Sequence, residues 1–164
     1  MSSPAPDMSR PPAAPAPRWP LILLRITSTT LALLAVLQTM LAGSFLNGTY
    51  DSLKDHEGNA MTLATVVVIQ LVVAGFVRRP GGGPLRPLWT TALLTVAVIG
   101  QIGAGYARAT GVHVTLGVLL VSGILFGLVG TWRLPLPARE GRPGAGPDGS
   151  GRLPRPGGPL EVKR

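Results

Sequence analysis

The amino-acid sequence predicts an all-α integral membrane protein, a four-helix bundle with up-down-up-down topology and disordered termini. Hydrophobic residues make up 46% of the 164-residue chain and are concentrated in four segments between Leu21 and Trp132. A membrane-spanning helix needs roughly 20 mainly apolar residues, with a range of about 17 to 25, and each segment falls within or just above this range. None of the four segments contains Asp or Glu. They also lack the polar face, repeating about every 3.6 residues, that a helix in a water-soluble bundle would show.

The four predicted spans cover residues of about 21–46, 58–77, 87–107 and 112–132, within a single bundle at 19–133. The first span is apolar except for Arg25, the cluster Thr27 to Thr30, and Gln38. It is longer than the apolar core of a signal peptide, about 7 to 15 residues, so we expect it to be retained as a span. Short loops between consecutive spans favour antiparallel neighbours, which gives the up-down topology.

The two ends of the chain, residues 1–18 and 134–164, are rich in Pro, Gly, Ala and Arg. Segments this poor in bulky apolar residues cannot bury a core, so both tails are predicted to be disordered.

Charge and aromatic residues predict the orientation. The loop at 78–87 holds three Arg and no acid, whereas the loop at 47–59 holds three acids against Lys54 alone. Because cytoplasmic loops carry the excess of Lys and Arg, both termini are expected in the cytoplasm. Abundant Gly, Pro and Arg with only two Lys are typical of a high-GC bacterial genome, so the expected location is a bacterial plasma membrane. Trp19, Trp89 and Trp132 fall at the predicted inner interface, where indole rings are favoured.

Several function classes find no support. The net charge of +8 comes mostly from Arg in the tails and one loop, which indicates topology and not a nucleic-acid partner. The chain has no Cys, no P-loop, no dinucleotide-binding glycine pattern and no Ser-His-Asp order, so nothing supports an enzyme of these kinds. The absence of acids from the spans argues against a carrier built on an intramembrane carboxylate.

The expected partners are the lipid bilayer and either another membrane protein or a second copy of the chain. The run from Gly123 to Gly127 fits the small-xxx-small pattern, which serves either packing inside the bundle or a dimer face.

The candidate site is formed by a repeated pattern. Gln38 lies near the end of the first span and His56 near the start of the second; Gln101 and His113 hold the same places in the third and fourth. These are the only two histidines, and the topology puts both at the outer face. Imidazole is a haem axial ligand, and bundle cores are where cofactors bind between facing helices. We therefore expect His56 and His113 to ligate haem iron, with haem b as the cofactor.

Four further residues are assigned to this site. The small residues Ala60 and Gly117, four positions after each His, would leave room for a porphyrin edge. Gln38 and Gln101 would donate to a free ring nitrogen of a ligand or to the haem edge. At the outer rim, Lys54 and Arg108 would pair with propionates.

Two other interpretations stay open. A His at a helix end often lies in the wet interface, and a Gln within a span often makes one interhelical hydrogen bond worth about 1 kcal/mol. On that basis the protein is a non-catalytic scaffold or partner-binding subunit without a cofactor. His56 with Asp51, Asp55 and Glu57 would alternatively form a metal cluster in the outer loop.

The order Gln, small residues, polar loop and His, present twice, resembles one four-helix half of haem A synthase. It is also similar to small bacterial four-span membrane proteins of unknown function. The resemblance covers about Leu31 to Gly130 and implies histidines at one face of the second and fourth helices. The chain is half the length of the synthase, and Ser52 and Leu53 stand where that family has an acid before the first His. The resemblance therefore implies haem binding without extending to synthase activity.

Overall fold

The computed structural model describes residues 17–79 and 83–136, which form four α-helices. They are α1 (Trp19–Leu46), α2 (Ser52–Arg78), α3 (Arg86–Tyr106) and α4 (Thr110–Trp132). All four are long and apolar enough to cross a membrane, which confirms the predicted all-α bundle. The predicted disorder of both tails falls almost wholly on residues outside the described ranges.

The helix boundaries follow from local chemistry. α1 and α3 both begin with Pro in their first turn, at Pro20 and Pro87, where the missing N–H removes no helical hydrogen bond. α2 begins at Ser52, six residues before the predicted start of the second span. The loop predicted at 47–59 is therefore only 47–51, and His56 lies on a helix and not in a polar loop.

Hydroxyl groups inside the spans bond to their own helices. Thr27, Thr29 and Thr30 each donate to the carbonyl four residues earlier, and Ser28 donates to the Leu24 carbonyl. Because a bilayer offers no water to satisfy a hydroxyl, this internal bonding lets the Thr27 to Thr30 cluster lie within an apolar helix.

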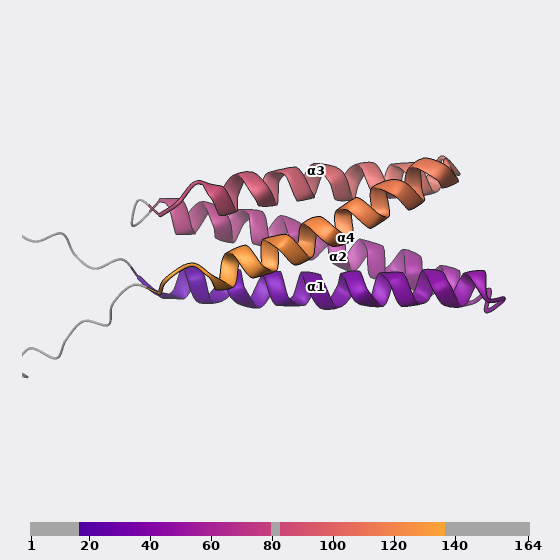
Figure 1. The fold of residues 1–164 in the computed structure, drawn as a ribbon, viewed down its shortest axis with the longest axis horizontal. Helices are drawn as coiled ribbons and strands as arrows, with labels where there is room; N and C mark the ends of the chain where they lie inside the picture. Colours follow the sequence, from indigo (N-terminus) through magenta and orange to yellow (C-terminus); the bar gives the residue numbers. More distant parts are fainter. Residues whose placement is uncertain (1–16, 80–82, 137–164) are drawn as a thin grey trace, which may run out of the picture.

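The helices form a closed ring in which α1 contacts α2 and α4, and α3 contacts α2 and α4. α2 and α4 are therefore diagonal partners. Figure 1 shows that α2 and α4 cross. At the right-hand end of the view, α4 lies beside α3 and α2 lies beside α1. At the left-hand end, α4 approaches α1 and α2 approaches α3. The bundle thus consists of two hairpins, α1–α2 and α3–α4, that pair differently at its two ends.

We name the two ends by their residues. The histidine end holds the loops 47–51 and 107–109, and the arginine end holds the opposite helix termini. The arginine end carries five Arg side chains besides Arg25, namely Arg18, Arg78, Arg79, Arg86 and Arg133.

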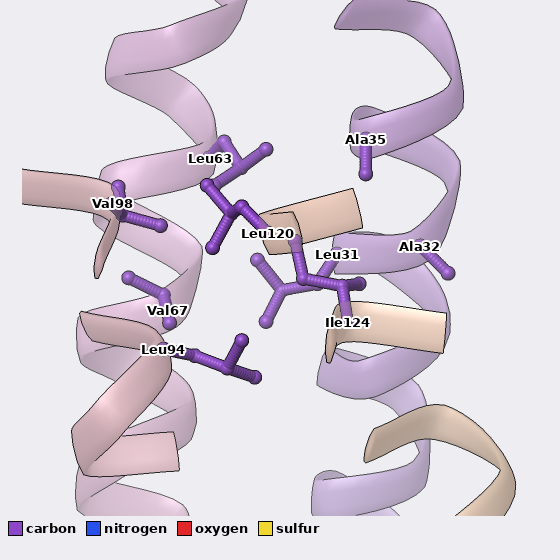
Figure 2. Close-up of a cluster of buried hydrophobic side chains, with 9 residues drawn as sticks. All are labelled: Leu31, Ala32, Ala35, Leu63, Val67, Leu94, Val98, Leu120 and Ile124. Carbon is purple, nitrogen blue, oxygen red and sulfur yellow. The ribbon is translucent and has the colours of Figure 1, made fainter. Parts of the chain in front are cut away.

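The main core lies midway between the ends, where side chains from all four helices meet (Figure 2). Outside this core the helices expose many large apolar side chains: Phe126 is 80% exposed and Leu93 72%. Exposed apolar surface on every helix is expected for a protein whose solvent is lipid. The nine core residues are Leu31, Ala32, Ala35, Leu63, Val67, Leu94, Val98, Leu120 and Ile124.

At the arginine end, Arg25 ties α1 to the end of α4. Its Nη2 donates to the carbonyls of Leu134 at 2.8 Å and Trp132 at 3.3 Å, and its guanidinium lies 5.0 Å from the centre of the Trp132 ring. The indole N–H of Trp132 donates to the Thr29 hydroxyl at 3.4 Å. The one charged residue of the first span is therefore held by carbonyls that α4 leaves unpaired at its terminus.

Candidate functional site: two clamped imidazoles

At the histidine end, Gln38 of α1 and His56 of α2 form a reciprocal pair. The Gln38 side-chain amide donates to the His56 backbone carbonyl at 3.0 Å. In return, His56 Nδ1 lies 3.3 Å from the Gln38 backbone carbonyl oxygen. Each residue thus supplies one side-chain and one backbone group, which joins the two helices by a closed pair of hydrogen bonds.

The same pair recurs between α3 and α4. The Gln101 amide donates to the His113 carbonyl at 2.9 Å, and His113 Nδ1 lies 3.0 Å from the Gln101 carbonyl oxygen. We call each pair a Gln–His clamp. The amides therefore do not donate to a free ring nitrogen, as the sequence led us to expect, but hold the histidine backbone instead.

The clamps determine the protonation of both rings. A carbonyl oxygen only accepts, so Nδ1 of each imidazole must carry a proton and donate it. In the neutral ring Nε2 is then the nitrogen with a lone pair, and so the ring atom that could bind a metal. A metal-bound His almost always has its other N–H held by a carbonyl or carboxylate, and both rings have this arrangement.

The two clamped rings face one another across the bundle. Their centroids are 6.1 Å apart and their planes are inclined by 56°. His56 belongs to one hairpin and His113 to the other, and both are half-buried. The structure therefore brings together two residues that are 57 positions apart in the sequence, as the predicted topology required.

A cavity of about 60 Å³ lies deeper in the bundle than the two rings. Both clamp glutamines line it, and so do Ala60 and Gly117, the small residues one turn after each His. The remaining lining is apolar, so Gln38 and Gln101 supply its polar groups. The other lining residues are Ala35, Leu63, Val98, Ile102, Leu120, Val121 and Ile124.

Two glycines have closer roles than the sequence suggested. A Cβ atom at Gly117 would lie 2.9 Å from the Gln101 amide nitrogen, so this glycine makes room for the clamp itself. A Cβ at Gly105 would lie 3.1 Å from Cε1 and 3.2 Å from Nδ1 of His113. The position of Gly105 against the imidazole becomes visible only in the fold.

Asn59, which sequence reasoning missed, reinforces one clamp only. It is 8% exposed, and its amide donates to both the Leu34 carbonyl and the Gln38 side-chain oxygen. The equivalent oxygen of Gln101 is buried and has no hydrogen-bond partner among the described residues. The spacing His-x-x-Asn on one helix face is the signal that could have pointed to Asn59, because residues three apart are neighbours.

The outer rim holds Lys54 and Arg108, the two residues that the sequence predicts to pair with propionates. Lys54 and Arg108 are exposed, and Arg108 has a φ of 54° in the tight α3–α4 turn. The only rim interaction across the hairpins among residues 17–79 and 83–136 is the Tyr106 hydroxyl donating to Glu57 at 2.6 Å. In that part of the chain no three His, Asp or Glu side chains gather as a metal site, so the outer-loop cluster with His56 has no support.

The small-xxx-small run packs inside the bundle. Cβ atoms at Gly123 and Gly127 would lie 3.2 Å and 3.8 Å from the Leu94 side chain of α3. These glycines therefore have a packing role within the chain, and nothing in their surroundings indicates a dimer face.

Fold and site together define a class: a four-helix bundle of membrane-span length with one clamped imidazole from each hairpin. Comparisons with protein-family models, with curated proteins and with solved structures gave no match.

Proposed function

We propose that the protein is a bis-histidine haem b bundle of a bacterial plasma membrane, acting in electron transfer or as an accessory subunit. His56 and His113 are the axial ligands, one from each hairpin. The observation that carries the proposal is the pair of clamps, which use Nδ1 of both rings and so leave each Nε2 with a lone pair, in two half-buried rings whose centroids are 6.1 Å apart.

The donor set favours haem over a bare metal ion. A structural Zn²⁺ takes four protein ligands and a catalytic one takes three, whereas two imidazoles are all that this site offers in the described residues. A porphyrin brings four nitrogens of its own and needs only the two axial ligands. Bound between the imidazoles, haem supplies reversible one-electron redox chemistry.

The spacing of the rings also agrees with this role. When two imidazole nitrogens bind one metal from opposite sides, each at about 2 Å, the ring centres lie roughly 6 Å apart. The centroids of His56 and His113 are 6.1 Å apart. The 60 Å³ cavity is far smaller than the roughly 300–1,000 Å³ of a typical ligand site. Neither histidine lines this cavity, so the porphyrin would lie between the two rings and not inside the cavity.

The orientation belongs to the same proposal. The arginine end faces the cytoplasm and holds both termini, and the histidine end faces outward, because the three described acids all lie near the histidine end and most Arg near the other. The haem would accordingly exchange electrons at the outer face of the membrane.

The test is the reduced-minus-oxidised visible spectrum of protein expressed with ample haem. We expect a sharp α band, which needs both axial ligands, and its loss in both His56→Ala and His113→Ala. The variant Thr62→Ala, at an exposed hydroxyl of α2 that bonds to the Gly58 carbonyl of its own helix, is the matched control and should keep the band. A featureless spectrum, or a band kept in both histidine variants, would contradict the proposal and favour a scaffold without cofactor. Circular dichroism of each variant verifies that the helices are intact.

A further inference from the structure

We propose that the corner between α2 and α3 at the arginine end binds the headgroup of an anionic phospholipid. The residues that bind the lipid are Arg78, Arg79, Arg86 and Trp89. This corner lies at the opposite end of the bundle from the two imidazoles. The inference therefore depends neither on haem nor on which face of the membrane the arginine end occupies.

The turn from α2 to α3 gathers three arginines at one corner. Arg78 and Arg79 stand at the end of α2 and Arg86 at the start of α3, and these two helices approach each other at the arginine end (Figure 1). Arg78 Nη1 donates to the Gly83 carbonyl at 3.1 Å, which ties the turn to α2. A side chain at Gly83 would collide with the Val77 carbonyl, so the turn can pack this closely only because glycine stands there.

The positive charge of this corner is not balanced by the described acids. All three arginine side chains are exposed, whereas Asp51, Asp55 and Glu57 lie at the histidine end. Like charges gathered at a protein surface repel one another more strongly than in bulk water. Arg78 and Arg79 suit the C-terminus of α2, but Arg86 begins α3, where the helix dipole disfavours a cation. An anion at the corner would offset both costs.

The rest of the chain does not supply this anion. Residues 137–164 contain six basic residues, five Arg and Lys163, against three acids, and residues 1–16 contain one Arg and one Asp. Neither segment has an excess of negative charge, so we expect the counter-charge to come from outside the protein.

The apolar side chains beside the arginines favour a lipid over a soluble anion. Arg86, Trp89, Leu93 and Val96 follow one another at intervals of three or four residues, so they share one face of α3. All four are exposed, and the Trp89 ring is 69% exposed. Because α3 runs away from the arginine end, this face presents a cation, then an indole at headgroup level, then apolar side chains at acyl-chain depth.

A phospholipid matches this order of groups. Its phosphate can accept paired hydrogen bonds from the planar guanidinium groups, and its acyl chain can lie along Trp89, Leu93 and Val96. Inorganic phosphate would gain the first contact only. Basic sites between membrane helices are known to bind anionic headgroups in this way.

The corner between α1 and α4 provides the matched control. Its Arg25 is already bonded to the Leu134 carbonyl and lies over the Trp132 ring. Arg18 and Arg133 remain there, at the start of α1 and the end of α4. Removing these two charges changes the total charge of the arginine end as much as removing Arg79 and Arg86 does.

Electron paramagnetic resonance of spin-labelled lipids tests the proposal on the full-length protein in phosphatidylcholine vesicles. The measured quantity is the association constant of spin-labelled phosphatidylglycerol with the protein, relative to that of spin-labelled phosphatidylcholine. We expect a preference of at least about fivefold, which corresponds to about 1 kcal/mol, the value for one Arg at an anionic membrane surface. The double variant Arg79→Gln with Arg86→Gln should lower the preference to less than about twofold. Arg18→Gln with Arg133→Gln should retain it, and circular dichroism verifies that both variants keep their helices.

Each other outcome overturns the proposal. A wild-type protein without a preference for phosphatidylglycerol has no such site. An equal loss in the two double variants would mean that the total charge of the arginine end attracts the lipid, and not the α2–α3 corner. Displacement of the labelled lipid by an excess of soluble glycerol phosphate would show that the corner recognises a free phosphate instead of a lipid.

Discussion

At the residue scale, the site depends on small groups that allow close approach. Gly117 leaves room for the Gln101 amide, and Gly105 leaves room for the His113 ring. An added Cβ at Gly117 would lie 2.9 Å from the amide nitrogen, and one at Gly105 would lie 3.1 Å from Cε1 of the ring. Displacing the Gln101 amide would break its hydrogen bond to the His113 carbonyl. These glycines are therefore part of the clamp on α3–α4, although neither has a side chain to contribute.

We expect Gly105→Ala and Gly117→Ala each to lower the free energy of unfolding by about 1 kcal/mol, the value of one net hydrogen bond or a small packing shift. Gly103→Ala is the matched control, because nothing lies within 4 Å of its added Cβ. It should be neutral or stabilising by up to about 1 kcal/mol, as Ala favours a helix. Unfolding by SDS titration, followed by circular dichroism, measures all three; equal losses in the three variants would refute the role of the two glycines.

Sequence reasoning reached the identity of the clamp residues but not their bonding. Gln38, His56, Gln101 and His113 stand out because polar side chains are rare in apolar spans. In the structure, the glutamine amides and the histidine Nδ1 atoms all donate to backbone carbonyls. This bonding depends on how each helix is rotated about its axis. Hydrophobic periodicity does not specify that rotation when a helix is apolar all round. The role of Asn59 was missed because this residue lay where the predicted loop at 47–59 overlaps the predicted span at 58–77.

At the element scale, the two ends of the bundle are held by different means. The histidine end is joined by the clamps within each hairpin, and the arginine end is joined across the hairpins by Arg25, which reaches from α1 to the end of α4. At the histidine end, the Tyr106 hydroxyl also joins the hairpins by donating to Glu57. The helix count and topology followed from hydropathy and loop length, because each span must satisfy its own backbone. The start of α2 did not, because its first turns are polar.

Replacing Arg25 by Met should lower the free energy of unfolding by about 2 kcal/mol, because two hydrogen bonds from a charged group and the stacking on Trp132 are lost. The exposed Arg133→Gln serves as control and should change stability by less than about 0.5 kcal/mol. The same SDS titration provides the comparison. An Arg25→Met variant as stable as Arg133→Gln would show that the contact contributes nothing.

At the scale of the whole molecule, charge and polarity divide the bundle lengthwise. Asp51, Asp55 and Glu57 lie near one end, and the five Arg beside Arg25 lie near the other. Since cytoplasmic loops carry the excess of basic residues, our proposal puts the haem toward the outer face of the membrane. This orientation was argued from the sequence, and the fold adds that both imidazoles share the acidic end.

The orientation is testable with a reporter enzyme fused after Arg142. A reporter that is active only in the cytoplasm should be active, and one that is active only after export should be silent. Fusions in the loop at 107–109 should give the opposite pattern. If the reporter fused after Arg142 is exported, the expected orientation is wrong and the histidines lie at the cytoplasmic face.

The central claim is that one iron binds both imidazoles between the two hairpins. Electron paramagnetic resonance of the ferric protein, with all histidines labelled with ¹⁵N, tests it most directly, since the chain holds only His56 and His113. The account predicts a low-spin signal with hyperfine coupling to the ¹⁵N atoms of two histidine ligands. In His113→Ala, coupling to one histidine ligand should remain. A high-spin signal, or coupling to a single labelled nitrogen in the wild-type protein, would contradict it.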